Sequence, residues 1–221
     1  MAELSRTYVT ESGDERRIAQ RMLLVYRTVK LIFGEHEILA VIRNVSSTGI
    51  AFRTFNAIDL PEQLHVKLAN GSIVPIKLAW QDKLSYGASF QTSVDLDIFL
   101  KSPPPDDRSG RSLRAKVGLK MYLRHNGRRW PAMLHDIGIG GAKLELERGQ
   151  NISVNGYAEM TIEGLGAHEG EIKWKRGPCA GMQFSHSLSF SSLAKWTTQL
   201  VNARMLAGSA PDSVDWAAPQ K

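Results

Sequence analysis

An internal repeat limits the possible folds of this chain more than any other feature of its sequence. Three short segments occur in the same order on both sides of a proline-rich stretch. They read RNVSSTGIAF, IKLAW and YGASF in the first half, and HDIGIGGAKL, GEIKW and AGMQF in the second half. Several matched residue types in one order indicate two copies of one domain.

The spacing within the repeat supports this interpretation. Gly49 precedes Trp80 by 31 positions, and Gly141 precedes Trp174 by 33 positions. In each half a glycine follows the tryptophan after seven positions, and a phenylalanine follows that glycine after three. These later residues are Gly87, Phe90, Gly181 and Phe184. We expect the two tryptophans to pack within their own copies.

Segments within each copy are typical of β-strands. VYRTVKLIF and ILAVIRNV are rich in β-branched and apolar residues, LHVKL alternates, and Gly, Asn and Ser clusters separate them. Many short strands joined by turns predict a small barrel or a sandwich in each copy. Leu193, Trp196 and Leu200 recur at helical spacing before Gly208. They predict one helix over residues 190–206 that packs against its own barrel.

The stretch KSPPPDDRSG separates the two copies. Its three consecutive prolines cannot continue a helix or a sheet ladder, so we interpret it as a linker. The predicted division is a first domain over residues 1–100, a linker over 101–107 and a second domain over 108–207. Residues 208–221 are predicted to form a flexible tail.

Composition and cysteine usage limit the class of protein. Hydrophobic residues make up 43% of the 221 positions and charged residues 23%, which is ordinary for a globular protein. The single cysteine, Cys179, allows no intrachain disulfide. The N-terminus lacks the apolar core of a signal peptide, and apolar runs such as MLLVY are too short to span a bilayer. We therefore expect a cytoplasmic protein.

Charge is divided unevenly between the two copies. Residues 1–100 carry 11 basic and 11 acidic side chains, whereas residues 101–221 carry 17 basic and 11 acidic side chains. The whole net charge of +6 therefore lies in the second half. Such a surplus permits an anionic partner, nucleic acid included, but specifies none.

Two short motifs in the first copy carry a resemblance to a known family. Arg17 and Arg21 form R-x-x-x-R, and Asn44, Ser46 and Gly49 form N-x-S-x-x-G at the end of a predicted strand. This pair of motifs resembles the signature of PilZ domains. PilZ domains are small β-barrels that act as receptors for the bacterial second messenger cyclic di-GMP.

The resemblance covers residues 12–100 and 108–206 and implies a fold and a function. The fold is all-β with minor α, as two tandem small antiparallel β-barrels with a C-terminal helix. The implied function is a cytoplasmic receptor that passes a conformational change to an unknown downstream protein partner. Cyclic di-GMP is the implied ligand, and no cofactor or metal is expected.

The chemistry of this ligand suits the residues of the two motifs. An arginine guanidinium meets phosphate oxygens or a guanine edge bidentately and also stacks on a base. Asn44 and Ser46 lie two apart on one strand face, where an amide and a hydroxyl can reach the same ligand. We expect Gly49 to permit a turn or a positive φ. Arg16 and Arg43 are secondary candidates for phosphate contacts.

The second copy departs from this pattern. Asp136 and Gly141 keep the outer positions of the second motif, but Gly138 replaces the serine. The position that corresponds to Arg21 is Leu113, with Arg114 beside it, and no two arginines here are four apart. We therefore predict that the second copy does not bind the messenger.

Other clusters of polar residues point to no chemistry of their own. His125 and His135 flank a strand-like segment without metal-ligand spacing, so we expect them to be solvated or packed. Cys179 occupies the position of Ser85 and has no base placed near it. No enzyme is therefore expected. The alternative is a nucleic-acid-binding small barrel that uses the basic second half, where LRHNGRRW combines arginines with an aromatic residue.

Overall fold

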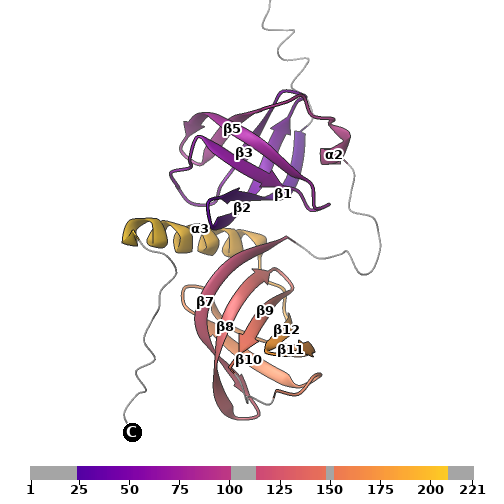
Figure 1. Ribbon diagram of the computed structural model, residues 1–221, viewed down its shortest axis with the longest axis vertical. Coiled ribbons are helices and arrows are strands. Elements are labelled where there is room, and N and C mark those ends of the chain that lie inside the picture. The colour runs from indigo at the N-terminus through magenta and orange to yellow at the C-terminus, as the bar shows by residue number, and fades with distance from the viewer. Residues whose placement is uncertain (1–23, 101–112, 148–151, 209–221) are drawn as a thin grey trace, which may run out of the picture.

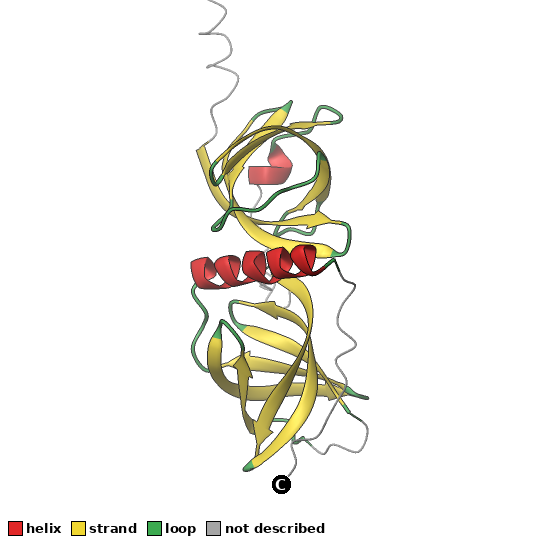
Figure 2. Cartoon of the chain, turned by 90° about the vertical axis from the view of Figure 1, so that its left-hand side faces the viewer, coloured by secondary structure: helices red, strands yellow, loops and turns green. Residues whose placement is uncertain are grey.

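The computed structural model describes residues 24–100, 113–147 and 152–208 (Figure 1). These residues form two closed antiparallel β-barrels of six strands each. The barrels lie one above the other along the long axis, and a helix crosses the junction between them (Figure 2). The prediction of two tandem small barrels with a C-terminal helix is confirmed.

The first barrel has the strand order β1-β2-β3-β6-β5-β4 and is closed by the pairing of β1 with β4. All of its strand pairs are antiparallel. A one-turn helix, α2, follows the last strand. The bounds are β1 (Leu24–Phe33), β2 (His36–Val45), β3 (Gly49–Arg53), β4 (Gln63–Lys67), β5 (Ile73–Asp82), β6 (Ser85–Phe90) and α2 (Asp97–Leu100).

The second barrel repeats this topology. Its closed order β10-β11-β12-β9-β8-β7 is the order of the first barrel read in the opposite direction. The pairing of β10 with β7 closes it. The bounds are β7 (Arg114–His125), β8 (Arg128–Gly138), β9 (Gly141–Leu146), β10 (Tyr157–Ile162), β11 (Gly166–Arg176), β12 (Cys179–Phe184) and the long helix α3 (Phe190–Ala207).

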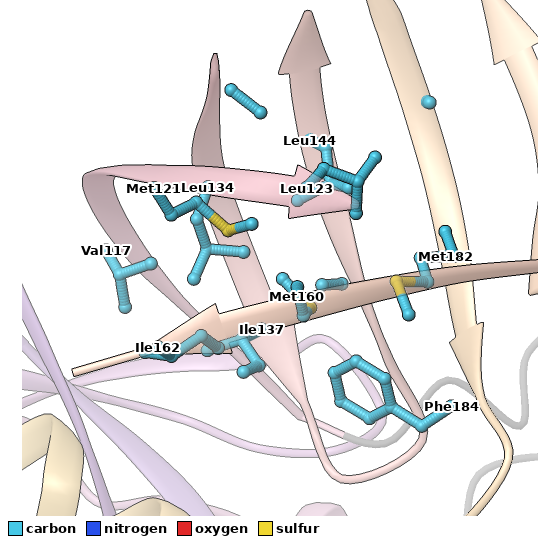
Figure 3. Close-up of a cluster of buried hydrophobic side chains, with 14 of the residues drawn as sticks. Val117, Met121, Leu123, Leu134, Ile137, Leu144, Met160, Ile162, Met182 and Phe184 are labelled. Atoms are coloured by element: carbon cyan, nitrogen blue, oxygen red, sulfur yellow. The ribbon is translucent and has the colours of Figure 1, made fainter. Parts of the chain in front are cut away.

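Each barrel encloses its own apolar core because alternate strand residues point inward. In the first core Tyr86 stacks on Phe52 at 5.3 Å between ring centroids, and its hydroxyl donates to the carbonyl of Ile58 at 2.8 Å. The second core uses flexible methionines, of which Met121, Met160 and Met182 are seen in Figure 3. Thioether side chains fill irregular gaps well, and barrels of the same topology are here filled by different residues.

Helix α3 begins and ends at recognisable caps. The Ser189 side chain accepts a hydrogen bond from the backbone N–H of Ser192 at 3.2 Å. At the other end Gly208 adopts a φ of 61°, the left-handed conformation that glycine tolerates. Leu193 and Trp196 are buried against the second barrel, as the helical spacing predicts.

The expectation that α3 packs only against its own barrel is incomplete. Val201 is buried in the core cluster of the first barrel. The Asn202 amide donates to the carbonyl of Ala57 at 2.8 Å, and the Asn56 amide donates to the carbonyl of Lys195 at 3.2 Å. The helix therefore joins the two barrels, which its own periodicity could not reveal.

Strand β2 supplies most of the first barrel's side of this junction. Leu39 is fully buried, yet it packs in the cluster of the second barrel rather than in its own. Beside it, the Lys30 ammonium lies 2.7 Å from a carboxylate oxygen of Glu37, and both side chains are only 8% exposed. Glu37 also accepts from the backbone N–H of Lys116 at 2.7 Å, and Lys30 donates to the carbonyl of Arg114 at 3.0 Å. A buried ion pair thus anchors the start of β7.

Candidate functional site

The polar motif of the first copy lies where β2 is bulged. Ile42 pairs with Phe52 and Asn44 pairs with Ala51, so Arg43 is an extra residue in β2. A bulge of this kind bends a strand and redirects its side chains. It places Asn44 on the outer face of the barrel, where it is exposed.

A tight turn follows the bulge and holds the serine of the motif. The Ser46 N–H donates to the carbonyl of Gly49 at 2.8 Å, which closes the hairpin between β2 and β3. The Ser46 hydroxyl lies 3.4 Å from both the hydroxyl and the backbone N–H of Thr48. These contacts are long for hydrogen bonds to a hydroxyl, so a ligand can replace them at small cost.

Gly49 is required for a reason other than the one expected from the sequence. It does not have a positive φ. Instead, a β-carbon at Gly49 would lie 2.8 Å from the carbonyl oxygen of Ala88 in β6. The glycine therefore allows β3 to approach β6 closely.

Trp80 contradicts the expectation that the matched tryptophans pack within the barrels. A register shift between Leu78 and Trp80 leaves the indole on the outer face, where Trp80 is 51% exposed. A β-carbon at Gly87 would lie 2.0 Å from the indole Nε1, so the indole lies directly against Gly87. The constant spacing of Trp and Gly in both copies was the sequence signal for this platform.

These residues surround one open cavity of about 330 Å³ on the first barrel. Asn44, Ala51, Gly87 and Trp80 follow one another across four neighbouring strands and form its floor. The complete lining is Asn44, Val45, Ser46, Thr48, Gly49, Ile50, Ala51, Ala79, Trp80, Gly87, Ala88 and Ser89. An aromatic platform thus lies beside an amide, a hydroxyl and exposed turn backbone.

The arginines expected at the site are not all within the described structure. Arg16, Arg17 and Arg21 lie outside the described residues. Arg43 is described, and its guanidinium lies 4.8 Å from the ring centroid of Tyr26. Arg43 is not among the residues that line the cavity, so it lies beside the site rather than in it.

Of the four positions that form the floor of the cavity in the first barrel, two have different side chains in the second barrel. Trp174 lies over Gly181, as Trp80 lies over Gly87, and is 37% exposed. Lys143, however, occupies the position of Ala51, and Asp136 occupies that of Asn44. The Asp136 carboxylate is paired with Arg114 at 2.8 Å. A charged cluster therefore replaces the neutral polar floor.

The other polar residues that the sequence singled out, His125, His135 and Cys179, all lie in the second barrel. His125 is buried, and its Nδ1 lies 2.7 Å from the carbonyl of Tyr157. His135 is bonded through Nε2 to the Glu145 carboxylate. Cys179 begins β12 as Ser85 begins β6, and it is partly buried.

Within the described ranges, no three His, Cys, Asp or Glu residues are grouped closely enough to hold a metal ion. Neither of the two described helices is both long and apolar enough to cross a lipid bilayer.

The chain belongs to the PilZ domain family. The family model matches residues 15–99 and again residues 108–200, which together make up most of the chain. The two matches coincide with the two barrels, so the protein is a tandem of PilZ domains. Among curated proteins, no sequence is similar to this chain.

Three solved structures illustrate its likeness to known proteins. Borreliella burgdorferi PlzA in complex with c-di-GMP is 15% identical, with a TM-score of 0.34, over 86% of this chain and 93% of that chain. K. pneumonia MrkH in its apo state is 16% identical, with a TM-score of 0.30, over 83% of this chain and 89% of that chain. Bacillus subtilis MotI/DgrA, an inhibitor of motility, is 12% identical, with a TM-score of 0.32, over 85% of this chain and 100% of that chain.

Proposed function

We propose that the protein is a receptor for cyclic di-GMP and that it binds the messenger on the first barrel. The observation that carries this proposal is the cavity beside the β2–β3 turn. Asn44, Ser46 and Gly49 of the N-x-S-x-x-G motif line it together with the exposed Trp80. Membership of the PilZ family supports the same ligand.

Each part of the cavity suits one part of this ligand. The exposed face of Trp80 offers a stacking surface for a guanine base, and such stacking is worth about 1–3 kcal/mol per base. The Asn44 amide can both donate to and accept from a guanine edge, and the Ser46 hydroxyl can donate to a phosphate oxygen. Arg17 and Arg21 would supply the cations for the two phosphates, as the family signature implies.

The second barrel is proposed to transmit the signal rather than to bind the messenger. Its equivalent floor contains the Arg114–Asp136 ion pair and the lysine at position 143. It contacts the first barrel through α3 and through the buried Lys30–Glu37 pair. A ligand that favours one arrangement of the two barrels would change the surface offered to a downstream protein.

Calorimetric titration of the full chain with cyclic di-GMP tests the proposal. We expect binding of the messenger but not of GMP or GTP, which lack the second guanine and the ring of two phosphates. Arg17→Ala and Arg21→Ala should each weaken binding more than Ser46→Ala, because a charge-assisted contact is about twice as strong as a neutral one. Arg53→Ala, an exposed arginine of β3 outside the cavity, is the matched control. Unchanged affinity in an Arg17→Ala, Arg21→Ala double variant would refute this site.

Nucleic-acid binding is the alternative, and the β7–β8 hairpin is where it would occur. The Arg129 guanidinium lies 4.0 Å from the ring centroid of Tyr122, and Arg124 is paired with Glu159. These contacts cover the ring of Tyr122 and neutralise one cation of the hairpin. Affinity for DNA or RNA that falls steeply with salt would favour this alternative.

A further inference from the structure

A second cavity, of about 350 Å³, lies at the junction of the two barrels. The start of β2 contributes His36, and the end of α3 contributes Arg204. Strands β7 and β9 contribute Lys116 and Lys143. The two barrels and α3, the helix that crosses their junction in Figures 1 and 2, therefore meet around one space.

The two lysines occupy corresponding places on either side of β8. Asp136 pairs with Lys116 on one side and with Lys143 on the other. In the first barrel, the corresponding partners of Asn44 are Leu24 and Ala51. Two apolar positions of the messenger-binding barrel are thus both lysines in the second barrel.

The acid between the lysines does not neutralise them. The Asp136 carboxylate lies 2.8 Å from a guanidinium nitrogen of Arg114, which satisfies its charge. Among the described residues, neither Lys116 nor Lys143 has an acidic partner in an ion pair. Glu35 is the other acid of the lining and lies on the exposed turn. The cavity therefore keeps two cations available to a ligand.

Arg204 fixes the opposite wall of the cavity. Its guanidinium donates to the carbonyls of Val117 and Gly118, at the bulge of β7. A cation held in place by backbone carbonyls adds positive potential without the entropic cost of ordering a free side chain.

We propose that this junction cavity binds a small anion that carries two phosphate groups. Lysine is a compact cation that suits phosphate. Because two strand spacings separate Lys116 from Lys143, their Cα atoms are about 10 Å apart. Two linked phosphates can contact both ammonium groups, whereas a single phosphate reaches them less well. The bound anion would hold both barrels and α3 in one arrangement, independently of the messenger.

Titration of the full chain with inorganic pyrophosphate at low salt tests this proposal. We expect binding that is stronger than that of orthophosphate and that weakens as salt is added. A Lys116→Gln, Lys143→Gln double variant should bind pyrophosphate about tenfold more weakly or worse. Lys195→Gln, which removes an exposed lysine of α3 outside the cavity, should bind it normally. Equal affinity in the double variant and the wild type, or no binding by the wild type, would overturn the proposal.

Two further measurements test whether the anion binds at the junction rather than at the messenger site, and whether a loss of binding reflects misfolding of the variant. Asn44→Ala should leave pyrophosphate binding unchanged, and loss of binding in that variant would place the anion on the first barrel instead. Pyrophosphate should also slow amide hydrogen exchange at Val117 and Gly118 in the wild-type chain. Unchanged exchange there would contradict the proposal even if the double variant failed to fold.

Discussion

The indole of Trp80 lies directly against Gly87, so that a β-carbon at residue 87 would come within 2.0 Å of its Nε1 atom. The same relationship holds between Trp174 and Gly181, with the same distance of 2.0 Å. Each barrel therefore carries an exposed tryptophan on its outer face, which lies against a cross-strand neighbour that has no side chain.

Gly87→Ala is expected to weaken cyclic di-GMP binding without unfolding the protein. The new methyl group displaces the end of a flexible side chain rather than backbone, so the cost in stability is small. The displaced ring would lose the stacking contact, which is worth about 1–3 kcal/mol. Calorimetry measures the affinity, and tryptophan fluorescence reports the displacement of the ring.

The second barrel offers a matched control for this experiment. Gly181→Ala displaces Trp174 by the same mechanism and should leave the affinity for cyclic di-GMP unchanged. A similar loss of affinity in both variants would mean that the platform of the first barrel is not where the base stacks.

Gly141→Ala is expected to destabilise the second barrel by about 1–3 kcal/mol. A β-carbon at Gly141 would lie 2.3 Å from the carbonyl oxygen of Met182, and the backbone cannot move away cheaply. The neighbouring Gly140 has open space around its β-carbon position and no positive φ. Gly140→Ala should therefore change the free energy of unfolding by less than about 0.5 kcal/mol. Urea unfolding followed by circular dichroism measures the free energy of unfolding of both variants. An equal loss of stability in the two would contradict the claim that Gly141 is needed where β9 lies close to Met182.

Glu37→Ala is expected to destabilise the protein by about 3–5 kcal/mol, because it leaves the buried Lys30 ammonium uncompensated. The backbone N–H of Lys116 would also lose its acceptor across the junction. Thermal or urea unfolding provides the measurement.

The exposed pair of Lys77 and Glu62 is the control for this prediction. Its side chains are 56% and 67% exposed. Glu62→Ala should therefore cost no more than about 1 kcal/mol. If the two variants are equally stable, the junction does not depend on the buried pair.

Tyr157 is expected to titrate at higher pH than a free tyrosine. Its hydroxyl donates to the Glu169 carboxylate, and this hydrogen bond is the main cause that raises the pKa of Tyr157. Because the raised pKa favours the neutral phenol in the folded chain, the associated stabilisation is present at neutral pH. It is lost as the pH rises through the folded pKa. Glu169→Gln should lower the pKa of Tyr157, as followed by tyrosinate absorbance, and an unchanged titration would show that the carboxylate is not the cause.

Much of the fold could be predicted from local patterns. The alternating segments predict strands because side chains of a strand point alternately to core and solvent. The spacing of Gly49, Trp80 and Gly87 predicts a repeat because two barrels of one topology need glycine at the same close contacts. Asn44 and Ser46 could be assigned to one site because they lie two positions apart, at the end of β2 and the start of its turn.

Which side of the barrel a residue lies on, and which residues it contacts, depended on the tertiary structure. Trp80 was expected in the core, but the register shift in β5 leaves it on the outer face, and no local pattern encodes that shift. The spacing of the α3 residues indicates a helix but cannot show that Val201 reaches the other barrel.

The sequence alone thus determined the repeat, the strands and the polar motif, since each depends on residues close in the chain or on a constant spacing. Only the tertiary structure decided what lies between the barrels. Leu39, Lys30 and Glu37 are buried there because the second barrel covers this part of β1 and β2. Such burial depends on residues more than 70 positions apart, and the hydrophobic effect acts on whatever surface the docked domains exclude from water.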